Sequence, residues 1–223
     1  MRLALIVVIC GAALGQQVVQ PGAPGKSSKR VSAAKATSSS TVSNADVEFM
    51  QGMIMHHEQA VEMVALLKVR GASKELQELG ERMRISQSDE IGFMKRWLTE
   101  RGKPTGMKMV HDMSTMTDKM PSMPGMLSAE QMKALREASG TSFDHLFLTG
   151  MIQHHTGALI MVDDLNRTAG ASQDPTIYDF ATDIDNTQSA EIAAMQALLN
   201  QTSSKESKRS EEHTSELQSH HDL

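Results

Sequence analysis

Two pairs of adjacent histidines are the residues of this sequence whose type and spacing best suit chemistry. His56 and His57 lie in the stretch FMQGMIMHHEQAVEM, and His154 and His155 lie in a matching stretch, FLTGMIQHHTGALIM. The two stretches also share a phenylalanine, a glycine, a Met-Ile pair, an alanine and a final methionine at equivalent positions. An internal duplication is the simplest explanation, and it indicates that both halves need imidazole at the same place.

Methionines accompany each histidine pair at helical spacing. Met53 lies one turn before His57, and a Glu-Ile-x-x-Met segment that also occurs twice can pack against each pair from a second helix. Imidazole and thioether without thiolate select soft monovalent ions such as Cu(I) or Ag(I). The predicted metal ligands are Met53, His56, His57, Met94, Met151, His154, His155 and Met195, with Met63 and Met161 next in line. Glu90 and Glu191 are predicted to hydrogen-bond the ligating imidazoles and fix their tautomers.

The alternative for these residues is an ordinary helical core. In that interpretation each histidine only hydrogen-bonds a neighbouring carboxylate or carbonyl group, and the methionines fill space. A single histidine on an apolar helix face favours this alternative. Four imidazoles in two matching pairs favour a ligand, because burying each one without a partner costs about 1–3 kcal/mol.

A methionine-rich segment between the two halves adds to the metal hypothesis. It reads GMKMVHDMSTMTDKMPSMPGM and is too rich in Gly, Pro, Ser and Lys to form a core. Its methionines would be exposed to solvent unless they bind a ligand, although they could also pad the bundle surface. The predicted auxiliary ligands are Met107, Met109, His111, Met113, Met116, Met120, Met123 and Met126.

Motifs typical of enzymes are absent from the sequence. It has no Glu-x-x-His pair of the di-iron bundles, no glycine-rich phosphate loop, no GxSxG and no HExxH. We therefore expect a protein that is not an enzyme. A weaker alternative is a redox enzyme in which bound copper cycles.

The helix expected to carry the first histidine pair begins near Asn44. Ser43 or Asn44 can cap it, and Gly71 ends it. Its apolar residues form two adjoining stripes, so both histidines point towards the core. A second helix, capped by Ser73, is expected to stop near Gly102.

The second half repeats this plan. A short helix from Ser128 to Ser139 precedes a third long helix, which Thr141 or Ser142 is expected to cap, and Asp174 with Pro175 opens a fourth. With only 3% aromatic residues and 18 methionines, the composition favours helices over sheets. We predict an all-α fold: a ferritin-like four-helix bundle over residues 44–201, made of two helical hairpins joined by a long crossover, residues 103–140.

The N-terminus indicates export. Residues 1–15 combine one arginine, a short apolar run and small residues, which is typical of a cleaved signal peptide. Cys10, the single cysteine, lies inside this segment, so the mature chain has no thiol. We expect a periplasmic or secreted protein with no membrane insertion after signal removal. The net charge of -5 gives no reason to expect nucleic acid as a partner.

Both ends of the mature chain are expected to be disordered. Residues 16–43 are rich in Ser, Ala, Pro, Gly and Lys and lack apolar periodicity, which predicts a tether. Residues 202–223 are predicted to form a tail. Within it, residues 209–219, RSEEHTSELQS, resemble the translation of a common sequencing adapter, so we expect the natural chain to diverge near Lys208 and exclude the tail histidines from the metal hypothesis.

The doubled Phe-x-x-Gly-Met-Ile-x-His-His-x-x-Ala-x-x-Met, each copy followed by Glu-Ile-x-x-Met, resembles the family called domain of unknown function 305, which is grouped with the ferritin-like bundles. The chain is similar also to exported copper-binding proteins within that family that are associated with copper resistance. The resemblance covers about Asn44 to Gln201. It implies an exported bundle that binds copper or silver through Met and His.

Together these patterns predict a protein that binds Cu(I), Ag(I) or Cu(II) for sequestration, transfer or resistance. Its expected partners are the metal ion and, in transfer, another copper-handling protein. The alternative is a metal-free interaction module of the cell envelope, whose methionine-rich face docks a partner helix. Whether the two repeats form one site or two stays open at this point.

Overall fold

The structure, a computed structural model, forms two compact units that divide after Thr41. The backbone is described for residues 18–20, 29–31, 42–106 and 123–219, and side chains for residues 42–106 and 123–202. In the first unit β1 (Val18–Gln20) pairs antiparallel with β2 (Lys29–Val31). The register pairs Val18 with Val31 in a segment that was expected to be a disordered tether.

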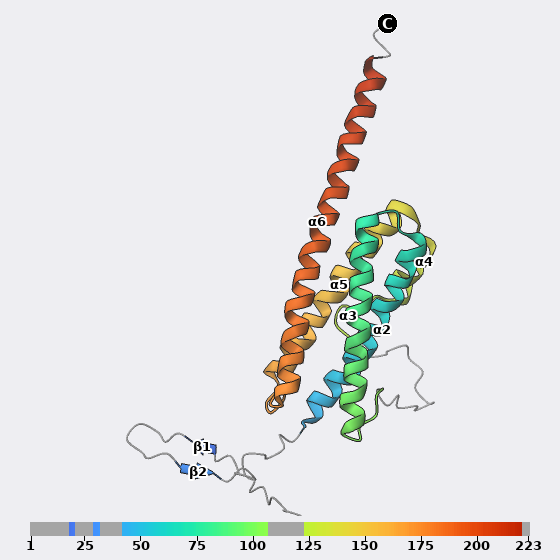
Figure 1. Cartoon of the computed structure of the whole chain (residues 1–223). Coiled ribbons are helices and arrows are strands. Elements are labelled where there is room, and N and C mark those ends of the chain that lie inside the picture. The colour runs from blue at the N-terminus through green and yellow to red at the C-terminus, as the bar shows by residue number, and fades with distance from the viewer. Residues whose placement is uncertain (1–17, 21–28, 32–41, 107–122, 220–223) are drawn as a thin grey trace, which may run out of the picture. The chain divides into compact units, whose positions relative to one another are not determined.

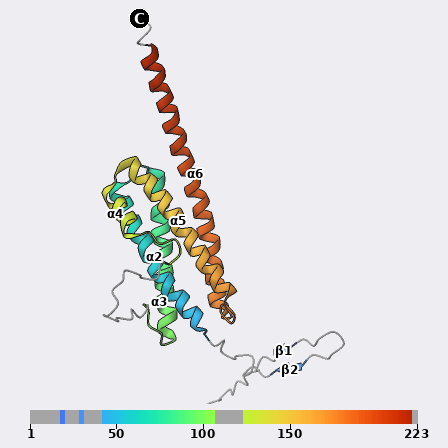
Figure 2. The same ribbon diagram turned by 180° about the vertical axis from the view of Figure 1, so that it is seen from behind.

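The second unit is an all-α bundle, which confirms the predicted fold class. Its helices are α2 (Asn44–Arg70), α3 (Lys74–Glu100), the short α4 (Ala129–Glu137), α5 (Gly140–Arg167) and α6 (Pro175–Ser219). The four long helices run side by side in both views (Figures 1 and 2), with α2 packed on α3 and α5, and α5 packed on α6. Within the described residues, no helix is both long enough and apolar enough to cross a membrane.

The helices of the first half begin where the sequence predicts. Ser43 caps α2: its hydroxyl accepts from the Asp46 N–H at 3.0 Å, and the Asp46 carboxylate accepts from the Ser43 N–H at 3.0 Å. This reciprocal capping box satisfies two of the N–H groups that a helix start leaves free. At the start of α3 the Ser73 hydroxyl accepts from the Leu76 N–H, without a reciprocal bond.

The start of α5 differs from the prediction. The helix begins at Gly140, with Ser139 at the cap position and no side-chain hydrogen bond there, so neither Thr141 nor Ser142 is the cap. Gly140 has a φ of 61°, a left-handed conformation that glycine adopts without a side-chain clash. The chain therefore turns directly from α4 into α5 at this glycine.

The start of α6 agrees with the prediction, whereas its end does not. The Asp174 carboxylate accepts from the Thr176 N–H at 2.9 Å, and Pro175 is the first helical residue. The helix then continues to Ser219, through residues 202–219 that were expected to be a disordered tail. The sequence contains no glycine or proline between Pro175 and Ser219, so no residue in it stops the helix.

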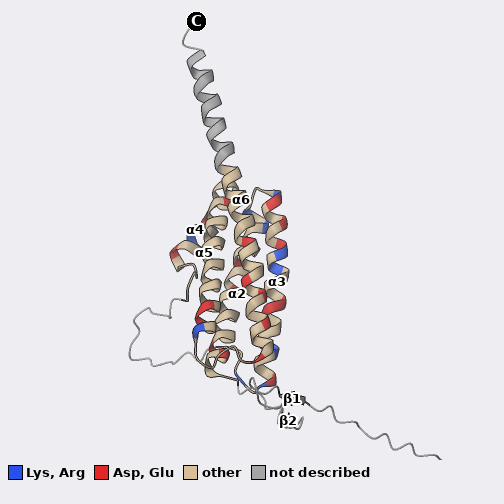
Figure 3. Cartoon of the chain, turned by 90° about the vertical axis from the view of Figure 1, so that its left-hand side faces the viewer, with Lys and Arg blue, Asp and Glu red and all other residues tan. Residues whose placement is uncertain are grey.

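The bundle interior consists of two apolar clusters. The Trp97 cluster contains the first half of α2, the end of α3, the second half of α5 and the start of α6. The Phe147 cluster contains the opposite ends of α2, α3 and α5, the middle of α6 and residues of α4. Charged residues recur along the whole of α3 in Figure 3, whereas the central part of α5 carries none. The unusual feature of this interior is a set of buried polar residues between the two apolar clusters, among them the two histidine pairs.

Candidate metal centre

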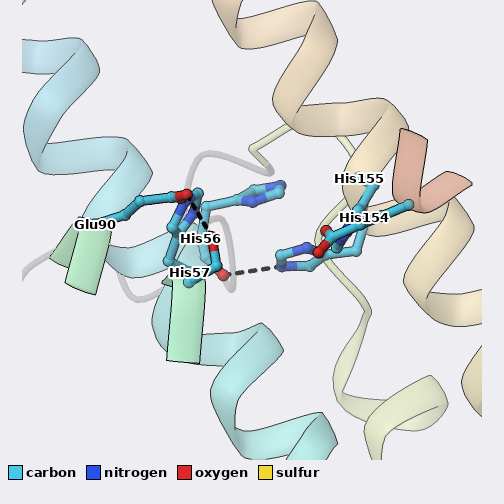
Figure 4. A network of polar contacts seen from close by, with 7 residues as sticks. His56, His57, Glu90, His154 and His155 are labelled. Carbon is cyan, nitrogen blue, oxygen red and sulfur yellow. Dashed lines mark hydrogen bonds and ion pairs between the residues drawn. The ribbon is translucent and has the colours of Figure 1, made fainter. Parts of the chain in front are cut away.

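Four imidazoles meet where α2 and α5 pack together, midway along the bundle. His56, His57, His154 and His155 all have 0% exposed surface. The ring centroids of His56 and His154 are 3.7 Å apart, with the ring planes tilted by 38°. Figure 4 shows these two rings between the outer pair, His57 and His155. The duplication thus brings the inner histidine of each repeat into direct contact with its counterpart.

Each outer histidine is held by a carboxylate from a neighbouring helix. His57 Nε2 donates to Glu90 Oε2 of α3 at 2.6 Å, and His155 Nε2 donates to Glu191 Oε2 of α6 at 2.7 Å. Both glutamates are largely buried, with 20% and 14% of their side chains exposed. The predicted Glu-His pairs therefore lie in contact in both halves, and each carboxylate fixes the proton of its imidazole on Nε2.

Each inner histidine is held by a backbone carbonyl. His56 Nε2 donates to Pro124 O at 3.0 Å, and His154 Nε2 donates to His56 O at 2.8 Å. Because a carbonyl oxygen only accepts, these bonds also place the proton on Nε2. All four imidazoles consequently present the same tautomer.

The second ring nitrogen is left without a partner in all four histidines. Nδ1 of His56, His57, His154 and His155 is buried and makes no hydrogen bond. In this tautomer Nδ1 carries a free lone pair, and leaving a buried polar atom unpaired costs about 1–3 kcal/mol. A neutral imidazole nitrogen with a free lone pair is a metal ligand. The four Nδ1 atoms are therefore candidate metal donors.

The surroundings keep the inner imidazoles neutral. Burial, followed by the neighbouring His57 and His155, lowers the pKa of His56 to about 3, against the raising effect of the Pro124 carbonyl. Burial and then the adjacent His56 lower the pKa of His154 well below its usual value. Both rings therefore remain in the metal-binding form at neutral pH, without a proton to displace.

The predicted methionine ligands fall into two crossed sets. Met53 and Met94 lie in the Trp97 cluster, and Met161, from the other repeat, packs against the same cluster. Met151 and Met195 lie in the Phe147 cluster together with Met63. Each cluster therefore contains predicted methionine ligands from both repeats.

Nitrogen and carboxylate donors alone do not complete a metal site. In the part of the chain that the structure describes, no group of three His, Cys, Asp or Glu side chains converges on a common point. A donor set with few charged oxygens suits Cu(I) and Ag(I) better than Zn²⁺ or Mg²⁺.

Two buried glutamines in the same layer were not predicted. Gln87 and Gln188 are each 2% exposed, and neither the nitrogen nor the oxygen of either amide has a hydrogen-bond partner. The signal was present in the sequence, because QSDEI in the first half matches QSAEI in the second. Only the glutamate and isoleucine of this match entered the prediction.

Two pockets reach predicted site residues from the surface. A pocket of about 210 Å³ between α2 and α5 is lined by Met161 and Pro124, among others. A larger one, of about 500 Å³, lies between α3 and α6. Its charged lining residues are Glu90, Asp89, Asp179, Asp183 and the basic Arg96. A cation could approach Glu90 along this acidic surface.

The end of the crossover covers the inner histidines. Pro124 and Gly125 lie against Gly157 of α5, while the Gln59 side chain of α2 bonds both the N–H and the carbonyl group of Leu127. Met123 and Met126 are half-buried here rather than solvent-exposed. The other predicted auxiliary ligands, Met107, Met109, His111, Met113, Met116 and Met120, lie outside the described residues.

Solved structures with the same fold include copper-bound proteins. A fragment from Deinococcus radiodurans, described as DUF305, is 26% identical to this chain, with a TM-score of 0.62. The match covers 72% of this chain and 98% of the fragment. A protein from Streptomyces coelicolor, described as a candidate secreted protein, is 27% identical with a TM-score of 0.61 over 70% and 93% of the two chains. CopM in its Cu(I)-bound form is 25% identical, with a TM-score of 0.55 over 70% and 96%.

CopM structures with other ions match as well. Its Cu(II)-bound form is 28% identical, with a TM-score of 0.53 over 70% of this chain and 96% of CopM. No curated protein matches the sequence. The family model described as domain of unknown function (DUF305) matches residues 46–199, from the first turn of α2 to the part of α6 that packs on α5. The duplicated His-His bundle thus belongs to the DUF305 family.

Proposed function

We propose that the chain is an exported protein, not an enzyme, that binds Cu(I) or Ag(I) through Met and His and serves copper sequestration, transfer or resistance. The observation that carries this proposal is the set of four buried imidazoles whose Nδ1 atoms have no hydrogen-bond partner. A core built only for stability would pair these atoms or replace them with apolar groups.

The donor chemistry supports a soft ion. His57 and His155 would bind through Nδ1, while Glu90 and Glu191 hold the opposite nitrogens and orient the rings. The buried thioethers of Met53, Met94, Met151 and Met195 would add sulfur ligands to the two half-sites. Met161 packs against the apolar cluster of Met53 and Met94, Met63 belongs to that of Met151 and Met195, and both are the next candidates.

The comparisons support the same ion class. CopM was crystallised with Cu(I), Cu(II) and Ag bound, and about a quarter of its residues are identical to those of this chain. The apolar N-terminus and the similarity to the Streptomyces coelicolor protein support export to the periplasm or the medium. Transfer to another copper-handling protein would use the methionine-rich crossover as an auxiliary site.

Titration with Cu(I) against a competing chelator tests the proposal. The mature chain should bind Cu(I), and the double variant His57→Ala/His155→Ala should lose most of this binding. His145→Ala is the matched control, because His145 also lies on α5 but is exposed. Unaltered Cu(I) binding in the double variant would contradict a site in the bundle.

Thermal unfolding distinguishes this proposal from a metal-free interaction module. A ligand that binds only the folded chain raises its melting temperature. We expect Ag(I) to raise the melting temperature of the wild-type chain and to leave that of His57→Ala/His155→Ala nearly unchanged. If neither Ag(I) nor Cu(I) changed the melting temperature of the wild-type chain, the interaction module would be favoured.

A further inference from the structure

Gln87 and Gln188 are the buried polar side chains that the proposed function leaves unexplained. They occupy matching positions in the two repeats, and each is only 2% exposed. All four polar atoms of the two amides lack a partner. An unpaired buried amide destabilises a folded chain, so its presence in both repeats indicates a use other than packing.

The two amides lie on the same helix faces as the predicted ligands. Gln87 precedes Glu90 by one turn and Met94 by two turns on α3, which places all three on one face. Gln188 precedes Glu191 and Met195 by the same steps on α6. The glutamates contact the outer histidines and the methionines are fully buried, so both amides lie in the polar layer between the two apolar clusters.

The free atoms of this layer have a definite chemical character. The four Nδ1 atoms are nitrogen atoms without a hydrogen-bond partner, and the amides add two oxygen donors. Thioether ligands favour Cu(I), whereas oxygen ligands favour harder ions, and an amide oxygen occurs as a weak ligand in some copper sites. A mixed set of imidazole, thioether and amide oxygen can therefore satisfy copper in both oxidation states.

We propose that Gln87 and Gln188 are specificity-determining ligands, whose amide oxygens let the two half-sites hold Cu(II) as well as Cu(I). This inference rests on the proposed copper-binding function. It extends that function from the soft Met and His donors to a pair of oxygen donors. It also explains why unpaired amides persist where leucine or methionine would stabilise the metal-free chain.

The variants Gln87→Met and Gln188→Met, singly and together, test this inference. Methionine has a similar length and flexibility but no amide, so it removes the oxygen donor with little change in volume. In the double variant we expect Cu(II) affinity to fall about tenfold or more, as after loss of a metal-site residue. Cu(I) affinity should stay the same or rise, because the introduced thioether is itself a soft donor, and the melting temperature of the metal-free chain should rise.

Gln51→Met is the matched control. Gln51 is also buried on a bundle helix, but its amide donates to Pro104 O at 2.7 Å, away from the histidines. This variant should lower the melting temperature and leave both copper affinities unchanged. Electron paramagnetic resonance of the Cu(II)-loaded chain should show an altered spectrum in the Gln87→Met/Gln188→Met variant and an unaltered one in Gln51→Met.

Different results overturn the inference and the proposed function. Unchanged Cu(II) affinity in the double variant, or equal losses for Cu(I) and Cu(II), would overturn the role of the amides while copper binding stands. A wild-type chain that binds Cu(I) but not Cu(II) would have the same consequence. A wild-type chain that binds neither ion at the histidines would overturn both.

Discussion

The two halves of the bundle carry the same histidine pair but hold its inner member differently. In the second half, His154 donates to the backbone of the first repeat, at His56 O. In the first half, His56 donates to Pro124 O, at the end of the crossover. The outer pairs, by contrast, have equivalent glutamate partners. The duplication is therefore symmetric at the outer histidines and asymmetric at the centre.

One pair of equivalent positions explains this asymmetry. The second residue after the histidine pair is Gln59 in the first repeat and Gly157 in the second. Gln59 bonds both backbone groups of Leu127, whereas Gly157 allows the crossover to lie directly on α5. The two repeats thus differ at the position that contacts the crossover: the first repeat binds it through a side chain, and the second has no side chain there, so the backbones lie in contact.

Acid should produce the largest effect on this centre, acting on one inner histidine from each half. Because the folded-state pKa of His56 and His154 lies below the unfolded value of about 6.5, the unfolded chain binds more protons as the pH falls. Stability should therefore be complete above pH 6.5 and decline towards pH 3, by about 1.4 kcal/mol for each pKa unit of difference per histidine.

Urea unfolding as a function of pH checks this expectation. His56→Gln and His154→Gln should each reduce the slope of stability against pH in this range, by about one proton. The exposed His145→Gln should leave the slope as it is. A reduced slope in only one of the two inner variants would show that the halves differ in their titration as well as in their partners.

Substitution of Gly157 should produce the next largest effect. A Cβ at this position would lie 2.0 Å from Pro124 O and 2.5 Å from Gly125 Cα, both rigid backbone atoms. Gly157→Ala should therefore destabilise the chain by about 3 kcal/mol or displace the crossover from α5. Thermal or urea unfolding measures the loss.

Gly92→Ala is the control for this glycine. Gly92 also lies within a helix, but an added Cβ would meet only the flexible end of Arg96, at 3.3 Å. Alanine should stabilise α3 here by about 0.5–1 kcal/mol, through its better helix propensity. If Gly157→Ala proved as harmless as Gly92→Ala, the crossover would not pack on α5 as described.

The contacts of the outer histidines could be predicted from the sequence, whereas those of the inner histidines could not. Adjacent histidines at matched helical positions, with a matched Glu-Ile-x-x-Met segment, place the His57–Glu90 contact on facing helices by periodicity alone. The stacking of His56 on His154 depends on how α2 crosses α5, which local periodicity does not encode. The bond to Pro124 depends on the path of the crossover, which no pattern specifies.

The helix boundaries show the same division between local and tertiary causes. The starts of α2, α3 and α6 follow from capping residues that act within one turn. The start of α5 at Gly140 depends on the turn from α4 and therefore escaped prediction. The buried glutamines escaped for a different reason, because a polar residue on a charged helix such as α3 is normally assumed to face solvent.

Removal of the Gln59 side chain should weaken the first half's contact with the crossover. Gln59→Ala leaves the N–H and carbonyl groups of Leu127 without their bonds of 2.8 and 3.1 Å. We expect a loss of about 1–2 kcal/mol in unfolding free energy. Gln153→Ala should cost less, because Gln153 is exposed and its bonds to Gly125 O and Met126 O are longer, at 3.3 and 3.4 Å. Equal losses would indicate that the crossover is held evenly from both helices.

The smallest effect is expected at a serine that distinguishes the two outer pairs. The Ser86 hydroxyl donates to Glu90 Oε1 at 2.9 Å, whereas the equivalent Thr187 is exposed and makes no hydrogen bond to Glu191. Ser86→Ala should therefore cost about 0.5–1.5 kcal/mol and loosen Glu90, while Thr187→Ala should be nearly neutral. Chemical shifts of the imidazole of His57 should move in the first variant, and those of His155 should stay unchanged in the second. If His155 responded as strongly as His57, the two Glu-His pairs would be equally supported, and the asymmetry of the halves would be confined to the inner histidines.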